Sequence, residues 1–590
     1  MRRFLPILLI SLLACWWVMR EQGAVVPAGE ETAQAAEYPA DAAARAGRVT
    51  GVELAWKAAD ELPADTAWQS GTPQPEAGDA AAVKGGRLRL CNVGPYPANF
   101  LAFGSPAPQF FHYNLTNACE LPLVARHPDT GADIPAVAEA WAVAGKVIRF
   151  RLNPAARYSN GRPVRAGDYV LGALLRAECG AAEHETLCRE AVRLGAYGDS
   201  VVELELRRAP ADAATAAALL HAAEPAFYAE FGSDYRTRYA QRIAPATGAY
   251  TVGKTERGRL IELVQVPHWW AADLPHFRRR FNPAAIEHHF LTDEAQSWEL
   301  LQRGKLDLLQ TRHLAAWQER RATHDTPLLF ESYAVEYPLP PYGIAFNTER
   351  LDNPALRRGL MHAMDMRKAV TVLFRGEVEP LRTFTSGYGE LSPTDTPQRS
   401  YDPAAARAAF AEAGYDRPAA DGILCRADGT RLSVRLCYTP SEKVSTLVNL
   451  LAESARRCGA EIVPEPLPWQ GCDRHLRESM HELMFWADLP AAPLPDYDRW
   501  FGAAAVSPFR LHDTALQQAI EQYRHAAPAD RAAAVAAVDA CIFRAACWLP
   551  AWQENRAWIA RRPHVHFPTG THRLYDLSEE HTLWLTPSTR

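Results

Sequence analysis

Histidine and cysteine are the residues of this chain whose types could bind a metal ion or form a disulfide bond. The sequence of 590 residues contains 19 His and 11 Cys. The cysteines lack the CxxC spacing of structural zinc sites, which argues against such a site. His288 and His289 are adjacent, and adjacent side chains of a strand point to opposite faces, so the pair would serve a single ion poorly. We therefore predict no metal site and no cofactor.

Cys179 and Cys188 bracket the short segment GAAEHETL, which could close as a disulfide loop. Such a bond is permitted in a protein that leaves the cytoplasm. The alternative is two unpaired small side chains. We predict the Cys179–Cys188 disulfide.

The sequence lacks the motifs of common catalytic and nucleotide-binding sites. It has no HExxH, GxSxG or Walker A motif, no GxGxxG after a strand, and no Ser, His and Asp set with the spacing of a triad. A net charge of −6 gives no electrostatic reason to expect nucleic acid as a partner. We predict no catalytic residues and a binding protein rather than an enzyme; an exported peptide hydrolase is a distant alternative.

The N-terminus has the form of a secretory segment, with two arginines before an apolar run from Phe4 to Leu13. The tetrapeptide that ends at Cys15 resembles the lipobox of bacterial lipoproteins, in which the Cys becomes the acylated N-terminus. Trp16 to Met19 prolong the apolar run, so an uncleaved anchor is the competing interpretation, although spanning normally takes ~20 residues. A third interpretation is that the N-terminal segment is cleaved off near Ala33-Gln34-Ala35.

From Arg20 to about Ala82 the composition shifts to Ala, Glu, Pro, Gly and Asp without a sustained period. Such a segment buries too little apolar surface to offset chain entropy, so we predict a tether. Trp56 and Trp68 suggest that parts of it rest on the folded body. The whole chain, at 48% hydrophobic and 22% charged residues, is ordinary for a globular protein of two to four lobes.

The stretch from Leu121 to Ala177 has the clearest order of elements. Leu121 to Ala125 reads as a short apolar strand, and a Pro-Asp-Thr-Gly turn follows. Pro135 to Ala144 has near-helical apolar spacing and predicts a helix. Val147 to Leu152 alternates as a half-buried strand does, and Asp168 lies near the start of a further helix.

The order of residues in this stretch closely resembles the signature region of the family 5 extracellular solute-binding proteins. These are the oligopeptide-, dipeptide- and nickel-binding components of ATP-driven importers. The family pattern runs roughly L-V-x-x-x-P-x-T-G-x-x-x-P-x-L-A-x-x-W, then F-x-L-x-x-x-A-x-F-S-D-G-x-P-V-x-A-x-D-V, and most positions are filled here. The departures are Val137, Tyr158, Asn160 and Tyr169, which stand for the usual Leu, Phe, Asp and Val.

Further matches are spread along the chain. Ala246 to Tyr250, Trp269-Trp270 and Leu301 to Asp307 look like the family elements G-T-G-P-Y, N-x-x-Y-W and L-x-x-G-E-x-D. Phe277 to Asn282 is similar to an insertion in the branch that contains the microcin C uptake protein. Asn353 to Asp365 matches N-P-x-V-R-x-A-L-x-x-A-I-D and predicts a helix that opens at Asn353-Pro354.

The resemblance implies ligand contacts from both sides of a cleft. In relatives the loop from Asn92 to Phe100 reaches the cleft, which makes Tyr96 and Asn99 candidates; a plain surface turn is the alternative. Tyr342 adjoins a strand that crosses between the lobes in relatives.

Trp486 and Asp488 lie where peptide-binding relatives carry W-x-[GA]-D, whose Asp receives the ammonium group of a peptide. An acidic acceptor in a water-poor cleft makes strong charge-assisted hydrogen bonds. The Trp is one place closer to the Asp here, and the usual D-P-D run is absent. A carboxylate on the surface of a lobe is therefore the alternative for Asp488.

The fold implied by the resemblance is α/β, with the two-lobed "Venus flytrap" architecture of type II periplasmic binding proteins. The first lobe would be discontinuous and carry an extra subdomain. The expected parts are a signal, lipoprotein or anchor segment at 1–19, a tether at 20–83, lobe I at 84–336 plus 548–590 with its subdomain at about 110–235, and lobe II at 337–547.

The function implied is that of the extracytoplasmic binding component of an ABC transporter. It would capture peptides or peptide-like solutes between the lobes and deliver them to a membrane permease. We expect a periplasmic or otherwise extracytoplasmic monomer, anchored by a lipid or by its N-terminal segment. The alternative is a membrane-tethered ligand sensor or docking protein without transport.

Overall fold

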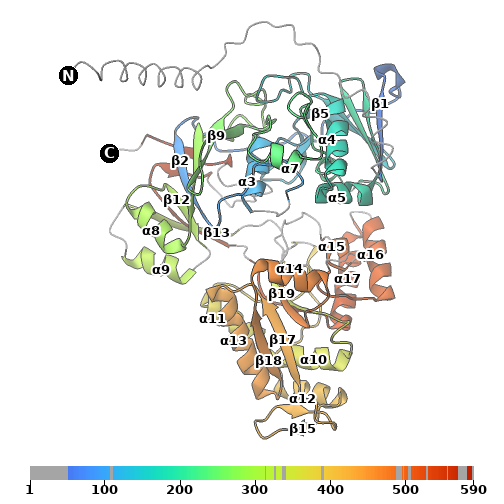
Figure 1. The fold of residues 1–590 in the computed structure, drawn as a ribbon, viewed down its shortest axis with the longest axis vertical. Coiled ribbons are helices and arrows are strands. Elements are labelled where there is room, and N and C mark those ends of the chain that lie inside the picture. Colours follow the sequence, from blue (N-terminus) through green and yellow to red (C-terminus); the bar gives the residue numbers. More distant parts are fainter. Residues whose placement is uncertain are drawn as a thin grey trace, which may run out of the picture.

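The computed structural model describes residues 51–105, 110–210, 212–311, 314–323, 327–334, 341–386, 388, 391–486, 495, 497–501, 507–526, 529–553, 556–568 and 581–587. These residues form a mixed α/β protein of two bodies (Figure 1). The described residues from 51 to 334 build the upper body of this view, those from 343 to 550 build the lower body, and the described C-terminal residues from 556 onward return to the upper one. No helix among the described residues is long and apolar enough to cross a membrane.

The largest sheet of the upper body has five strands in the order β1-β7-β8-β6-β5. The strands are β1 (Glu53–Lys57), β5 (Ala138–Ala144), β6 (Val147–Leu152), β7 (Ala191–Tyr197) and β8 (Val201–Leu206). Helix α4 (Ala166–Glu178) packs against β1, β7 and β8, and α5 (Ala182–Glu190) follows it. The strand predicted at Val147 to Leu152 and the helix predicted near Asp168 are confirmed.

The tether predicted for 20–83 is wrong from residue 51 onward. Strand β1 pairs in parallel with β7 along its whole length, and Val52 is 1% exposed. Strand β1 could not be predicted from the sequence, because it is a short edge strand with few apolar residues. Its neighbours supply the rest of the core. Trp56 packs against that core, and the guanidinium of Arg151 lies 5.0 Å from the ring centroid of Trp68. Both tryptophans therefore rest on the folded body, as the sequence suggested.

The helix predicted at Pro135 to Ala144 is also wrong. Residues 138–144 form β5, which pairs antiparallel with β6, and Trp141 lies opposite Phe150. Gly145, with φ of 62°, occupies the tight turn between the two strands. Alternating alanines suit a helix by propensity, but here the turn and the pairing with β6 decide the conformation.

Two further sheets complete the upper body, one in the order β2-β11-β10-β9 and one in the order β12-β21-β13. Their strands are β2 (Arg87–Val93), β9 (Tyr250–Glu256), β10 (Leu260–Gln265), β11 (Ala285–Leu291), β12 (Leu308–Thr311), β13 (Leu329–Ala334) and β21 (Arg556–Arg561). The remaining elements of this body are β3 (Val124–Arg126), β4 (Asp133–Pro135), β22 (Val565–His566), β23 (Trp584–Leu585), η1 (Ala59–Glu61), α3 (Phe110–Cys119), α6 (Ala213–Ala217), α7 (Tyr235–Arg238), α8 (Glu294–Gln302) and α9 (Leu314–Thr323).

The lower body is built on a five-stranded sheet in the order β18-β17-β19-β14-β20. Its strands are β14 (Gly343–Phe346), β17 (Ser433–Tyr438), β18 (Glu461–Pro466), β19 (Leu483–Trp486) and β20 (Trp548–Pro550). The other elements are α10 (Pro354–Ala363), α11 (Met366–Phe374), α12 (Pro403–Glu412), β15 (Arg417–Pro418), β16 (Leu424–Cys425), α13 (Glu442–Arg457), α14 (Trp469–Arg477), α15 (Tyr497–Phe501), α16 (Thr514–His525) and α17 (Arg531–Ala545). Helix α10 opens as predicted, because the Asn353 side chain accepts hydrogen bonds from the amides of Ala355 and Leu356.

The chain passes between the two bodies twice, and the two crossings are paired on both sides. In the upper body β13 pairs antiparallel with β21, and in the lower body β14 pairs antiparallel with β20. Between these pairs the Tyr342 amide donates to the Trp552 carbonyl and the Ala551 amide to the Tyr342 carbonyl, each at 2.8 Å. The return therefore begins after Pro550, and not after Cys547 as the expected lobe limits had it.

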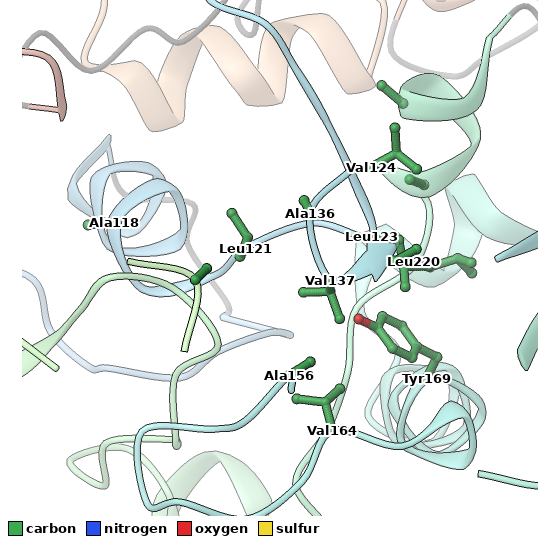
Figure 2. Packing of buried hydrophobic residues seen from close by; sticks show 14 of the residues in the cluster. Ala118, Leu121, Leu123, Val124, Ala136, Val137, Ala156, Val164, Tyr169 and Leu220 are labelled. Atoms are coloured by element: carbon green, nitrogen blue, oxygen red, sulfur yellow. The ribbon is translucent and has the colours of Figure 1, made fainter. Parts of the chain in front are cut away.

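The signature stretch lies in the core of the upper body, where Leu121, Ala136, Val137 and Tyr169 converge (Figure 2). Nearby, the buried carboxylate of Asp168 accepts hydrogen bonds from the Arg165 amide at 2.9 Å and from the Tyr158 hydroxyl at 3.0 Å. A Phe at position 158 would have no hydroxyl to donate. The motif is therefore structural: it caps α4 and fixes the loop that precedes it.

Candidate functional site

Aromatic rings gather where the chain crosses into the lower body. The ring of Tyr342 stacks on that of Trp552, with centroids 5.2 Å apart and planes 7° apart. The Tyr342 ring also stacks on the ring of Phe485, with centroids 5.9 Å apart and planes 30° apart. Together with the two backbone hydrogen bonds, this stack holds Tyr342 of the forward crossing against the return segment.

Trp486 of β19 lies opposite Gly343 of β14, so its side chain points to the other face of the sheet from Tyr342 and Phe485. Gly343 is required by the close approach of β20: a Cβ atom there would lie 2.5 Å from the Trp548 ring and 2.6 Å from the Leu549 carbonyl oxygen. The Trp486 ring meets Trp500 edge-on, with centroids 6.0 Å apart. Its buried indole N–H has no hydrogen-bond partner among the described residues, which leaves a donor for an incoming acceptor.

The two residues with the most specific predicted roles, Asp488 and Cys15, lie outside the described residues. The strand that leads to Asp488 is described as far as Trp486, and it belongs to the same sheet as β14, which begins directly after Tyr342. The structure gives the position of Trp486, and the roles of Trp486 and Asp488 in ligand binding stay predictions.

Tyr96 and Asn99 belong to the upper body. Tyr96 packs edge-on against Phe290 at 4.9 Å, and burial raises the pKa of its hydroxyl. Asn99 is buried; its side-chain carbonyl accepts from the Leu101 amide at 3.2 Å and lies 3.1 Å from Nε2 of His112. Through these bonds the Asn99 side chain connects its own loop to α3. Among the described contacts, neither residue touches Tyr342 or Trp486.

Helix α14, which sequence reasoning did not single out, lies on the side of the lower body that faces the upper one (Figure 1). Arg477 near its C-terminus is bonded to Asp473, with Nε 2.9 Å from Oδ2. This bond and the charge of Asp473 raise the pKa of Arg477, and the charge of Glu185 on α5 of the upper body adds to the effect. The two bodies therefore approach one another along α5 and α14. No sequence motif predicts this proximity of charges, because it depends on how the two bodies are placed.

The predicted disulfide between Cys179 and Cys188 is wrong. Cys188 is a free cysteine whose Sγ lies 3.1 Å from Nε2 of His184. Cys179 caps the end of α4, whereas Cys188 sits in the last turn of α5, so two helix ends orient the two side chains separately. The eight residues between the two cysteines are enough for a disulfide loop. In the structure, however, most of them belong to helix α5, which keeps the two thiols apart.

A cavity of about 330 Å³ lies within the lower body. Its walls come from the ends of α10 and α17, from β20, and from residues 380–384 and 396–401. None of the four described ligand candidates lines it. The guanidinium of Arg399 lies over the Phe543 ring at 3.8 Å there, and burial lowers its pKa to about 10. The cavity and the predicted ligand residues are thus different places.

The side chains of Tyr342 and Trp486, on opposite faces of the sheet, offer the chemistry of non-covalent recognition. Stacked aromatic faces offer apolar surface, and the indole N–H offers a hydrogen-bond donor. Within the described ranges, no group of three or more His, Cys, Asp or Glu side chains could hold a metal ion. His288 is buried with Nδ1 3.1 Å from Nδ2 of Asn92, while Nε2 of His289 lies 3.1 Å from Glu287.

Comparison with known proteins assigns residues 134–505 to the sequence profile of the bacterial extracellular solute-binding proteins, family 5. A putative binding protein of Brucella melitensis is 22% identical over 264 residues, which are 43% of this chain and 42% of that protein. The chain thus matches about two fifths of the length of that relative.

Solved structures share the fold. The oligopeptide-binding protein AppA from Bacillus subtilis, in complex with a nonapeptide, superimposes with a TM-score of 0.69 at 15% identity; the match covers 86% of this chain and 100% of AppA. The periplasmic binding protein DppA from Helicobacter pylori, in complex with the peptide STSA, gives 0.68 at 14% identity, over 85% of this chain and 98% of DppA. Both are two-lobed proteins, as the two bodies of this chain are.

Proposed function

Because this chain belongs to the family 5 bacterial extracellular solute-binding proteins, we propose that it captures a peptide or peptide-like solute between its two lobes for delivery to an ABC permease. Members of this family are binding proteins and not enzymes. The observation that carries the proposal is the pair of crossings, β13–β14 and β20–β21, which join two α/β lobes by a narrow double connection. Such a connection suits hinge motion.

The mechanism follows from thermodynamics. A ligand shifts an equilibrium between open and closed forms only through contacts that are better in one of them. A space between two lobes offers contacts from both walls only when it is shut. Ligand binding therefore favours the closed form, and the permease recognises the closed form.

The proposed ligand walls contain the residues predicted from the sequence. In the lower lobe Trp486 supplies an aromatic face and a spare N–H, and Asp488 holds the cationic group of the ligand. Tyr342 lies at the hinge, on the opposite face of the sheet from Trp486. In the upper lobe Tyr96 is the stronger candidate, because the side-chain carbonyl of Asn99 already serves its own loop. The peptide complexes of AppA and DppA support a peptide-like ligand.

The proposed location is outside the cytoplasm, with the folded lobes on a membrane anchor at the N-terminus and the chain acting as a monomer. Cys15 would carry the lipid; an uncleaved N-terminal segment is the competing anchor. Radiolabelled palmitate should enter the wild-type protein and not Cys15→Ala, and an unlabelled wild-type protein would favour the uncleaved anchor.

The ligand itself can be identified by mass spectrometry of whatever co-purifies with the protein. Calorimetry with that ligand then tests the site. Asp488→Asn should weaken binding by about 1.5–3 kcal/mol, roughly ten- to hundred-fold, because the ammonium of the ligand loses its charged partner in a dry site. Asp416→Asn, an exposed carboxylate of the same lobe, is the matched control. If Asp488→Asn binds as tightly as wild type, Asp488 is not in the site.

Two other functions make different predictions. A membrane-tethered sensor would bind the same ligand without transport, so deletion of the protein would leave uptake of that ligand unchanged. A peptide hydrolase would release fragments from a peptide during incubation, which chromatography detects directly.

A further inference from the structure

The sulfur atoms of Cys437 and Cys472 meet in the lower lobe. Cys437 lies on β17 and is 1% exposed; Cys472 lies on α14 and is 5% exposed. Of the ten cysteines in the described part of the chain, these two are close enough for each thiol to shift the pKa of the other. They are 35 residues apart in sequence, so the contact is made by the fold.

The surrounding contacts hold α14, which carries Cys472, against β17, which carries Cys437. Leu476, one turn after Cys472, packs with Cys437 and Met484 in one small buried cluster, so one face of α14 rests on the sheet. The hydroxyl of Thr439 donates to Sγ of Cys472 at 3.5 Å. Backbone hydrogen bonds hold the start of the helix, because the Leu467 amide donates to the Tyr438 carbonyl at 2.9 Å.

We propose that Cys437 and Cys472 are a modification site: the two thiols close to a disulfide bond that fastens α14 to β17. The proposal rests on the proposed extracytoplasmic location, since that is where disulfides form and persist. The co-reactant is a disulfide donor, either a protein of oxidative folding or a small disulfide such as oxidised glutathione.

The chemistry is two successive thiol–disulfide exchanges. The thiolate of Cys472 attacks one sulfur of the donor, forms a mixed disulfide and releases one donor thiolate. The thiol of Cys437 then loses its proton and attacks Sγ of Cys472, which closes the internal disulfide and releases the second donor thiolate. The donor takes both electrons, and the two protons of the cysteines end on the released thiols.

The electrostatics of the pair favour Cys472 as the first nucleophile. The hydrogen bond from Cys437, together with that from Thr439, lowers the pKa of Cys472 despite its burial. The same shared proton raises the pKa of Cys437. A thiolate is the attacking species in exchange, so the cysteine with the lowered pKa reacts first.

The location gives the bond a consequence for the binding wall. Helix α14 faces the upper lobe (Figure 1), and the cluster under it includes Trp486 at its edge. A disulfide between α14 and β17 would limit the movement of the helix against the sheet that presents Trp486. Since both sulfurs are buried, we expect the bond to form as the chain folds and to resist reduction in the folded protein.

The test is to unfold the full chain with reductant, refold it in oxidised and reduced glutathione, and alkylate the remaining free thiols in denaturant before peptide mapping. The expected result is a single disulfide-linked peptide pair that contains Cys437 and Cys472. The oxidised protein should also melt several degrees higher than the reduced one, because the bond restricts the unfolded chain. Both effects should vanish in Cys472→Ser and in Cys437→Ser.

Cys458→Ser is the matched control, since Cys458 is a buried cysteine of the same lobe. It should keep the linked peptide pair and the difference in melting temperature. Complete alkylation of Cys437 and Cys472 after refolding in oxidised glutathione would overturn the proposal, as would a linked pair that involves other cysteines. Peptide binding is not measured in this experiment, so its failure would leave the proposed transport function untouched, and loss of peptide binding would leave the disulfide standing.

Discussion

At the scale of single residues, His288 is a histidine that the fold keeps uncharged. Its side chain is 2% exposed, and its ring meets Phe111 edge-on at 5.0 Å. The amide of Asn92 lies 3.1 Å from Nδ1, where a neutral ring accepts the hydrogen bond. Burial, followed by the charge of His289, lowers the pKa of His288 from 6.5 to about 3.

This lowered pKa predicts a loss of stability in mild acid. Above pH 6.5 both the folded and the unfolded chain carry a neutral His288, so the group contributes nothing there. Between pH 6.5 and 3 the unfolded chain takes up a proton that the folded chain does not, so the free energy of unfolding falls. At pH 4 the cost of this one group should be roughly 3 kcal/mol.

Urea unfolding at pH 7 and pH 4 checks this prediction with His288→Gln. The variant should lose less stability between the two pH values than wild type does. His512→Gln changes an exposed histidine and should behave as wild type. Equal losses in wild type and His288→Gln would show that His288 titrates normally in the folded protein.

Single residues also show what the sequence could and could not predict about the site. Tyr342 and Trp486 stay predictions as ligand residues. The register places their side chains on opposite faces of one sheet, which the sequence alone does not show. Asn99 and the Cys179–Cys188 pair are different cases. The sequence shows that an amide or a thiol is present, but the partners of Asn99 and the helix that separates the cysteines are set by tertiary packing.

At the scale of elements, Asp307 joins three segments that are distant in the sequence. Its buried carboxylate accepts Nε and Nη2 of Arg89 on β2 at 2.9 and 2.6 Å, and the Arg89 amide at 2.9 Å. On the other side it lies 3.2 Å from Nε2 of His564 in the returning C-terminal segment. This Asp is the last residue of the matched L-x-x-G-E-x-D element, so the motif has a structural role here: it ties the return to the first strand of the sheet.

Asp307→Asn should therefore destabilise the upper lobe strongly. The substitution leaves the Arg89 guanidinium partly buried without a charged partner, and breaking such a pair costs about 3–5 kcal/mol. The urea midpoint measures the loss. Asp421→Asn removes an exposed partner of Arg431 in the other lobe and should change the midpoint little. A midpoint for Asp307→Asn equal to that of wild type would mean that water replaces the bond at no cost.

Elements with strong local signals were predictable, and elements made by pairing were not. Asn353-Pro354 carries its own cap and begins a helix as predicted. Residues 138–144 read as a helix because alanine favours one, yet the turn at Gly145 and the partner strand make them a strand. Strand β1 has no visible signal at all, because most of its stabilisation comes from β7 and α4.

At the scale of the whole molecule, the two crossings define how the lobes can move. β20 ends in the lower sheet and β21 begins in the upper one, so the return crossing is only a few residues long. At Tyr342 the forward crossing is hydrogen-bonded to Ala551 and Trp552 of the return. We propose that the first lobe consists of the chain from residue 51 to the end of β13 together with the segment from β21 onward, and that the second lobe consists of β14 to β20. Two adjacent short crossings allow bending while they resist translation.

Small-angle X-ray scattering of the purified protein, with and without the co-purifying ligand identified by mass spectrometry, tests the central claim most directly. The account predicts that saturating ligand reduces the radius of gyration, because the lobes close around it, and that Asp488→Asn needs more ligand for the same change. Scattering curves unchanged by saturating ligand, with calorimetry showing that the ligand is bound, would contradict closure between the lobes.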